Sequence, residues 1–171
     1  MNTIIKKLSI FILLAAALGA CKKEGYFGKD YTTDPLPDVR PAVSVTVPNA
    51  IDYRPEPTVG ASKSAGGPIQ IVLSIPAASG RTIKEITKVA ANTTYTQIQG
   101  SGNTGYYVST PIPVNSTTAT FNTSLTAYVA NAAGNVIPAS NTELAKRFYF
   151  LLTLDDGSQV IPMAVRVLVL D

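Results

Sequence analysis

The chain has 171 residues, with 14 lysines and arginines, 11 acidic residues, eight tyrosines, one cysteine, no histidine and no tryptophan. The absence of histidine removes the usual general base and the usual metal ligand, so we expect no Ser-His-Asp catalysis and no histidine-held metal. No long basic run occurs, which argues against nucleic acid as a partner.

The first 20 residues predict a secretory signal. Lys6 and Lys7 precede an apolar run at residues 8–18 that only Ser9 interrupts. A helix of this length spans about 17 Å at ~1.5 Å per residue, which is too short for a hydrocarbon core of about 30 Å. A charged start before a short apolar core is typical of export signals. We therefore interpret residues 1–20 as a signal peptide.

The end of this segment indicates the kind of signal. Leu18, Gly19 and Ala20 precede Cys21, and together they resemble the lipobox of bacterial lipoproteins. The resemblance implies that a peptidase recognises the first three residues and that Cys21 receives a diacylglycerol, which anchors the chain to a membrane. Each buried methylene contributes about 0.8 kcal/mol, so two or three acyl chains hold the protein there. Because Cys21 is the only cysteine, we expect no disulfide framework.

Residues 21–42 are predicted to be the lipidated N-terminus and a flexible tether. They are charged, contain glycines and prolines, and lack apolar periodicity. Residues 22–25 are similar to the short charged signals that follow the lipidated cysteine in Bacteroidota and favour display on the outer face of the outer membrane. A solvated charged tether accounts for them equally well. Some 20 extended residues reach about 66 Å, enough to clear the lipid head groups.

From residue 43 onward, apolar residues recur with the period of two that β-strands require. The clearest strands are expected at residues 43–47, 69–75, 82–89, 118–122, 148–154 and 160–170. Shorter strands are expected around residues 95–98 and 106–109. Residues 124–128 could open a helical turn, but Gly134 and Pro138 prevent a long helix.

Two strands carry specific predictions. The strand expected at residues 82–89 should place Ile83 and Val89 on one side, with Lys84, Ile86 and Lys88 on the other. The strand expected at residues 160–170 should form a hairpin with the strand at 148–154, through a turn that contains Asp156 and Gly157. Pro162, in the second strand of this hairpin, lacks an N–H and should lie at a sheet edge or a bulge.

Seven or eight short strands without a long helix indicate an all-β domain over residues 43–171, an antiparallel sandwich of immunoglobulin-like type. Residues 147–158, with 160–162 and 165–167, resemble a type of Bacteroidota outer-membrane lipoprotein with a single immunoglobulin-like domain. Such lipoproteins resemble accessory components of starch-utilisation-type systems, in which surface proteins assist a TonB-dependent porin. The resemblance implies architecture rather than a catalytic site.

Tyr106 and Tyr107 are the candidate ligand-contact residues. On a strand, one of two adjacent rings faces the core and the other lies outside. An exposed tyrosine beside a loop of glycine, asparagine and serine offers a flat apolar face and a polar tip to a sugar or a protein. Core packing with an incidental surface ring is the competing interpretation.

Two other patterns are interpreted as loops or turns. Residues 100–105 match G-x-G-x-x-G, but a strand-like segment follows them, and no acidic residue occurs between Glu85 and Glu143. Asp155 and Asp156 are adjacent in a tight turn, where side chains seldom converge on one metal ion. We therefore expect no catalytic residue, no metal site, no cofactor and no enzymatic activity.

These observations predict a surface-exposed outer-membrane lipoprotein that is a binding or accessory module, within an assembly for nutrient (glycan) uptake. Its expected partners are the membrane, through the lipid on Cys21, and an outer-membrane protein or a glycan. The alternative is a structural or adhesive subunit that assembles through β-strand edges.

Overall fold

The computed structural model describes residues 43–100 and 105–171. The described residues all belong to one compact unit. The predicted signal peptide, the recognition residues before Cys21, Cys21 itself and the tether lie outside the described residues, so they stay predictions. No helix in the described ranges is long and apolar enough to cross a membrane.

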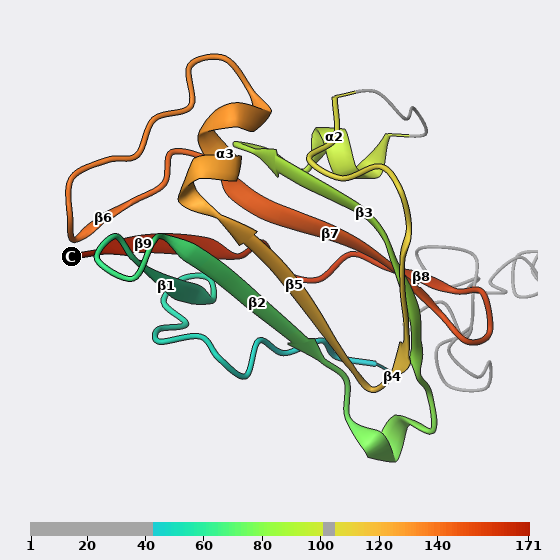
Figure 1. The fold of residues 1–171 in the computed structure, drawn as a ribbon. Coiled ribbons are helices and arrows are strands. Elements are labelled where there is room, and N and C mark those ends of the chain that lie inside the picture. Colours follow the sequence, from blue (N-terminus) through green and yellow to red (C-terminus); the bar gives the residue numbers. More distant parts are fainter. Residues whose placement is uncertain (1–42, 101–104) are drawn as a thin grey trace, which may run out of the picture. The chain divides into compact units, whose positions relative to one another are not determined.

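The described part is mostly β-structure with short helical segments, which confirms the β-rich part of the prediction (Figure 1). The immunoglobulin-like sandwich stays a prediction. In chain order the elements are β1 (Thr58–Ser62), β2 (Pro68–Ser74), η1 (Ala77–Ser79), β3 (Ile83–Asn92), α2 (Thr96–Gln99), β4 (Ile112–Ser116), β5 (Thr118–Ser124), α3 (Leu125–Asn131), β6 (Thr142–Glu143), β7 (Arg147–Leu154), β8 (Gln159–Val160) and β9 (Arg166–Leu170). The helical turn expected near residue 124 is α3, which begins where the Ser124 hydroxyl accepts a hydrogen bond from the Ala127 N–H.

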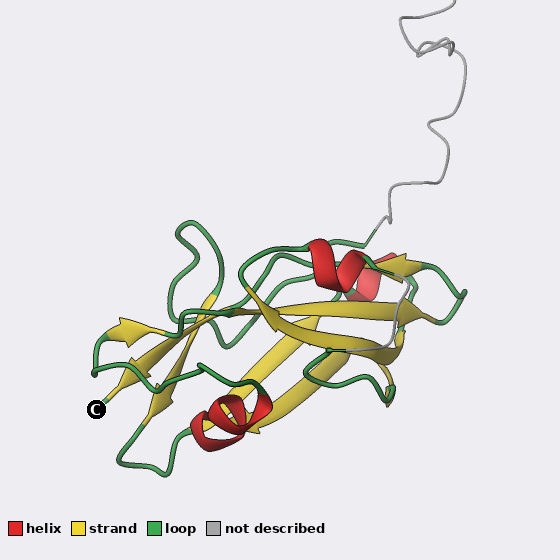
Figure 2. Ribbon diagram, turned by 90° about the horizontal axis from the view of Figure 1, so that it is seen from above, coloured by secondary structure: helices red, strands yellow, loops and turns green. Residues whose placement is uncertain are grey.

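The strands form three small sheets, with the orders β1-β9-β6, β2-β5 and β4-β3-β7-β8. Strands β1 and β9 pair in parallel, whereas the other paired strands of the described part are antiparallel. Figures 1 and 2 show β2–β5 and β3–β7 as separate layers, with the third sheet at one side.

The apolar core is built from strand faces with a period of two. The alternating apolar residues of β2 and of β7 are buried, as the sequence predicts, and they pack with Ala119 and Phe121 of β5. Strand β7 is also buried on its other face, where Tyr149 and Leu151 join Ile98 of α2 in a second cluster. This burial on both faces makes β7 the central strand of the domain.

The predicted facing of β3 is wrong for Ile86. Ile83, Ile86 and Val89 are all fully buried in the same core. Of the three residues expected on the outer side, Lys84 is exposed, Lys88 is half-buried and Ile86 is buried. The register with β7 shifts twice, between Ile83 and Glu85 and between Ile86 and Lys88. Each β-bulge adds one residue to the strand and reverses its alternation, so Ile86 turns inward.

Three predicted strands are reduced or replaced. Residues 95–98 were expected to be a strand, but helix α2 occupies this region and its Ile98 packs on the outer face of β7. Residues 106–109 contribute one bridge, between Val108 and Val89, and residues 43–47 contribute one, between Thr46 and Ser74. Burial against other elements fixes these segments, and a short apolar run does not encode that context.

The returning strand predicted at residues 160–170 is two strands. β8 pairs with β7 for two residues, and Pro162 follows at this edge of the sheet. Proline has no N–H for the ladder, so the pairing cannot continue beyond it. The chain crosses over at Val165, which bridges Phe148, and β9 then pairs with β1 and β6 in another sheet.

Candidate functional site

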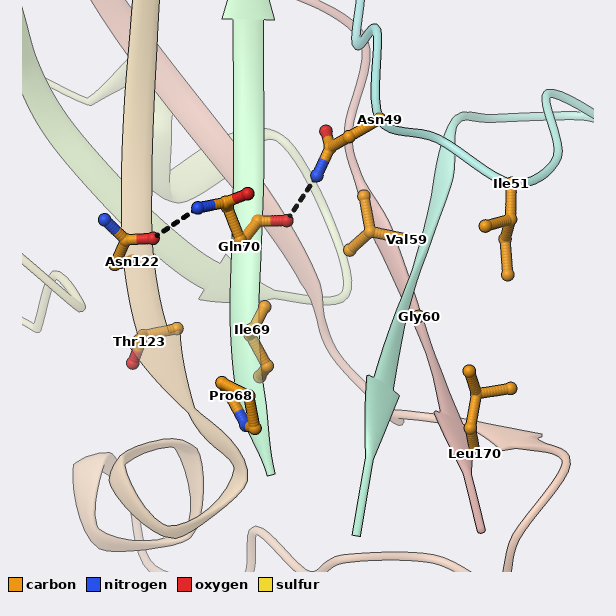
Figure 3. A pocket seen from close by; sticks show the side chains of 10 residues that line it. All are labelled: Asn49, Ile51, Val59, Gly60, Pro68, Ile69, Gln70, Asn122, Thr123 and Leu170. Carbon is orange, nitrogen blue, oxygen red and sulfur yellow. Dashed lines mark hydrogen bonds between the residues drawn. The ribbon is translucent and has the colours of Figure 1, made fainter. Parts of the chain in front are cut away.

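A groove with a volume of about 560 Å³ lies between β1 and β2 (Figure 3). Ten residues line it: Asn49, Ile51, Val59, Gly60, Pro68, Ile69, Gln70, Asn122, Thr123 and Leu170. None of these side chains carries a charge, and three of them end in a carboxamide. We call this feature the β1–β2 groove.

The groove exists because two consecutive strands join different sheets. The carbonyl of Ser62 still accepts a hydrogen bond from the Gly67 N–H, but the Gly67 carbonyl accepts one from Leu125. Beyond this turn β1 pairs with β9 and β2 pairs with β5. The two strands therefore do not form a ladder with each other, and their facing edges line the groove.

Asn49 closes part of the β2 edge in place of a neighbouring strand. Its Nδ2 donates to the Gln70 carbonyl at 2.8 Å, and its Oδ1 accepts from the Val72 N–H at 3.0 Å. Both ends of one carboxamide are therefore used to satisfy backbone groups of β2. This fixes the side chain at the groove wall, as Figure 3 shows for the bond to Gln70.

The remaining edge groups of the groove are open. Thr58 bonds Ile51 and Asp52 on the side away from β9, so Gly60, two residues on, directs its N–H and carbonyl the same way. Neither group of Gly60 has a hydrogen-bond partner among the described residues, and the same is true of the Gln70 N–H. A Cβ at Gly60 would lie 2.8 Å from Leu170 Cδ1, so glycine permits this close approach.

Two further carboxamides leave polar atoms available to a ligand. Gln70 Nε2 donates to Asn122 Oδ1 at 3.3 Å across the β2–β5 pair (Figure 3). Within the described part this leaves Gln70 Oε1 as an acceptor and Asn122 Nδ2 as a donor without partners. Ile51, which is 59 % exposed, and Leu170 supply apolar surface at the opposite side of the groove. This combination suits a neutral ligand with hydroxyl or amide groups.

Tyr107 packs between β5 and β7 and does not line the groove. Its hydroxyl is 2.6 Å from Thr123 Oγ1, and its ring packs edge-on against Phe121 and Phe148. Burial raises the pKa of the Tyr107 hydroxyl above its usual value. Only its partner Thr123 reaches the groove.

Tyr106 lies elsewhere, against the second apolar cluster. Its hydroxyl is 2.9 Å from the Gln97 carbonyl and 3.0 Å from that of Gly100, and Lys88 Nζ lies 4.8 Å from its ring centroid. The two tyrosines are thus directed to different clusters, and both are half-buried. Their role in ligand contact stays a prediction.

The carboxylates of the described part are mostly held by arginines. Ion pairs join Asp52 to Arg54, Glu56 to Arg147, Glu143 to Arg166, and both Asp155 and Asp156 to Arg81. Hydrogen bonds from Ser158, and then the charge of Arg81, lower the pKa of Asp156, which belongs to the β7–β8 turn as predicted. No group of three His, Cys, Asp or Glu residues that could hold a metal ion occurs in the described ranges.

No sequence pattern indicated the groove residues. Gln70 and Asn122 are exposed positions of alternating strands, where polar residues are ordinary. They become neighbours only through the β2–β5 register, and Asn49 reaches β2 from an irregular segment. Single polar residues in separate segments do not reveal such a cluster.

Comparisons of the chain with protein-family models, with curated proteins and with solved structures give no match. The interpretation of the β1–β2 groove therefore rests on the residues of this chain and their geometry.

Proposed function

We propose that the chain is a membrane-anchored, non-catalytic lipoprotein whose immunoglobulin-like domain binds a neutral saccharide in the β1–β2 groove. In this proposal Cys21 carries the lipid, and the protein is an accessory module of an outer-membrane assembly for glycan uptake. The observation that supports it is the groove itself, with three carboxamides and no charged side chain in its lining.

The chemistry of the lining favours sugar hydroxyls. A carboxamide offers both a donor and an acceptor in one plane, and a hydroxyl can satisfy both. Asn49 is fixed by β2, whereas Gln70 and Asn122 keep an acceptor and a donor free for a ligand. A phosphate or carboxylate ligand would meet no counter-charge from the lining side chains, so a neutral ligand fits better.

A non-catalytic role is supported by the state of the acidic residues. General acid–base chemistry needs a carboxylate or another base whose pKa is matched to its task and whose position faces the substrate. Here Glu56, Glu143 and the Asp155–Asp156 pair are engaged with arginines, and none of them lines the groove.

The binding proposal is tested by titrating the purified chain with neutral oligosaccharides while following side-chain amide resonances by NMR. We expect shifts confined to Asn49, Gln70 and Asn122 with at least one saccharide. The double variant Gln70→Ala with Asn122→Ala should weaken binding about tenfold or more, which corresponds to the loss of one or two hydrogen bonds. Gln99→Ala, an exposed glutamine outside the groove, is the matched control and should bind normally.

Two results would contradict the binding proposal. One is a complete panel of neutral saccharides that leaves the groove resonances unchanged. The other is equal binding by the double variant, which would place the ligand elsewhere on the domain. Hydrolysis of any of these saccharides, lost on substitution of one carboxylate, would instead contradict the non-catalytic part of the proposal.

The accessory role is tested by purifying the tagged, lipidated protein from outer membranes in mild detergent and identifying bound proteins by mass. We expect a porin and its partner lipoprotein in comparable amounts. The Cys21→Ser variant is the control. Because it cannot carry the lipid, it should no longer be recovered with the membrane fraction. Recovery of the wild-type protein alone would contradict an accessory role and favour free-standing ligand binding.

A further inference from the structure

Among the described residues, strand β5 is paired along one edge only. In the described part it forms a ladder with β2, and Figure 1 shows β2 beside one of its edges. The residues of β2 that face away from β5 are known from their bonds: the Val72 N–H goes to Asn49 and the Ser74 N–H goes to Thr46. Their partners in β5 must therefore also direct their backbone groups away from the ladder.

The outward residues of β5 are Thr118, Thr120 and Asn122, which pair with Ser74, Val72 and Gln70. All three side chains are exposed. The backbone N–H and carbonyl groups of Thr120 and Asn122 have no hydrogen-bond partner in the described part of the chain. The edge thus presents an ordered row of unpaired donors and acceptors, about 7 Å apart along the strand.

In the described part, the outer edges of β2, β4 and β8 are largely protected, whereas that of β5 is not. Thr46 and Asn49 cover the outer edge of β2, β4 contains Pro113, and β8 is two residues long before Pro162. Strand β5 is seven residues long, contains no proline and no charged residue, and pairs with β2 without a register shift. Proteins normally block such an edge, so an open one indicates a pairing site.

We propose that β5 pairs antiparallel with β5 of a second copy of this chain, so that β2–β5 becomes a four-stranded sheet across a two-fold axis. Identical edges related by a two-fold axis are self-complementary and close into a dimer. The pairing brings Thr120 opposite Thr120 or Asn122 of the other copy, since only outward residues can bond each other. This inference uses backbone groups of β5 and does not depend on which ligand the β1–β2 groove binds, although the Asn122 side chain also lines that groove.

The charge pattern favours a second copy as the occupant. Self-pairing places like residues close together, so any charge in β5 would face the same charge, and like charges opposite each other are destabilising. The whole strand from Thr118 to Ser124 is uncharged, and threonines suit cross-strand contact. If Cys21 is lipidated, the membrane also holds copies at high local concentration.

The test compares oligomeric state and amide exchange at increasing protein concentration. The described residues form one compact unit. The experiment therefore uses the chain from residue 21 onward with Cys21→Ser, which has neither a thiol nor a lipid. Sedimentation velocity should show a monomer–dimer equilibrium below about 1 mM, the order of concentration that tethering provides. NMR should show slowed exchange of the Thr120 and Asn122 amides only in the dimer, while the Phe121 amide, which bonds β2, is protected throughout.

Two variants at the edge and one control make the test specific. Thr120→Pro removes an N–H that β2 does not use, and Thr120→Lys places a charge near the two-fold axis. We expect either change to weaken dimerisation about tenfold or more. Val72→Lys adds the same charge on β2, directly opposite Thr120 in the ladder, and should leave dimerisation unchanged.

The proposal is overturned if the chain stays monomeric to ~1 mM with fast exchange at Thr120 and Asn122. It is also overturned if a dimer persists in both Thr120 variants, or if Val72→Lys disrupts it equally. Circular dichroism on each variant ensures that a lost dimer is not a lost fold.

Discussion

At the scale of single residues, Tyr107 links the two layers of the domain. Its ring contacts Phe121 of β5 and Phe148 of β7, with centroid distances of 6.1 and 5.2 Å. Edge-on aromatic contacts of this kind add to the burial of the rings themselves. The hydroxyl is used as well, at 2.6 Å from Thr123 Oγ1. Tyr107 thus contributes both its ring and its hydroxyl to packing between the layers.

We expect Tyr107→Phe to lower the free energy of unfolding by about 1 kcal/mol, because it removes one hydrogen bond and leaves the ring contacts. Urea denaturation followed by circular dichroism measures this. Tyr106→Phe is the matched control, since the Tyr106 hydroxyl bonds only carbonyls at and next to α2. It should speed amide exchange in α2 and change global stability less. An equal loss in both variants would contradict this assignment.

Two tyrosines, Tyr107 and Tyr128, also predict a dependence on alkaline pH. Burial raises the pKa of Tyr107 and of Tyr128, whose hydroxyl accepts a hydrogen bond from the Lys146 N–H. A pKa that is higher in the folded state means that the folded state holds the proton more tightly. The resulting stabilisation is complete below the unfolded value of about 10 and is lost as the pH rises through the folded values.

The unfolding midpoint in urea should therefore fall as the pH rises above about 10, and phenolate absorbance should show tyrosines that ionise late. Tyr107→Phe should make the fall shallower because one of the two groups is gone. If all tyrosines ionise together near pH 10 without loss of stability, this interpretation of their burial is wrong.

At the scale of elements, period-two patterns predicted the buried face of a strand only where its register is regular. β2 and β7 follow the pattern, and their buried faces agree with the sequence. β3 departs from it because two bulges reverse the alternation, and only the pairing with β7 reveals them. Segment 95–98 is too short to distinguish a strand from the helix α2, which depends on contacts with β7.

The bulge at Thr87 leads to a prediction about chain length. Thr87 is the extra residue between Ile86 and Lys88, and its hydroxyl bonds that of Thr153 outside the core. Deleting Thr87 should give a ladder that is regular from Glu85 onward and still places Ile86 and Val89 inward. We expect this variant to fold, with a loss of unfolding free energy within the ~0.5–3 kcal/mol typical of single changes.

Deletion of Ala90 is the matched control for this experiment. Ala90 lies in regular register opposite Tyr149, and it is fully buried. Its loss shifts the end of β3 by one residue and sends side chains to the wrong face. We expect a larger destabilisation, measured by the same urea titration. If both deletions cost the same, Thr87 is not the inserted residue of a bulge.

At the scale of the whole molecule, the last strand connects parts that are far apart in sequence. β9 pairs with β1 in parallel and with β6, while the residue before it, Val165, bridges Phe148 of β7. The sequence predicted a buried C-terminal strand but assigned it to the preceding hairpin. Parallel pairing with a strand about a hundred residues earlier leaves no local signal, so its partner could not be predicted from spacing.

From this position we expect β9 to be essential to the fold. Val167 and Val169 are 0 % exposed in the core, and burial of each contributes about 1.5–3 kcal/mol. Removing residues 166–171 should cost most of a typical stability of about 5–15 kcal/mol, because β1 also loses its ladder. We expect this truncated chain to show no cooperative transition in urea.

Arg166→Ala, which removes only a partly exposed ion pair with Glu143, is the control and should cost about 1 kcal/mol or less. A truncated chain that unfolds cooperatively near the wild-type midpoint would show that the β1–β9–β6 sheet is an appendage and that the two other sheets alone form the folding unit.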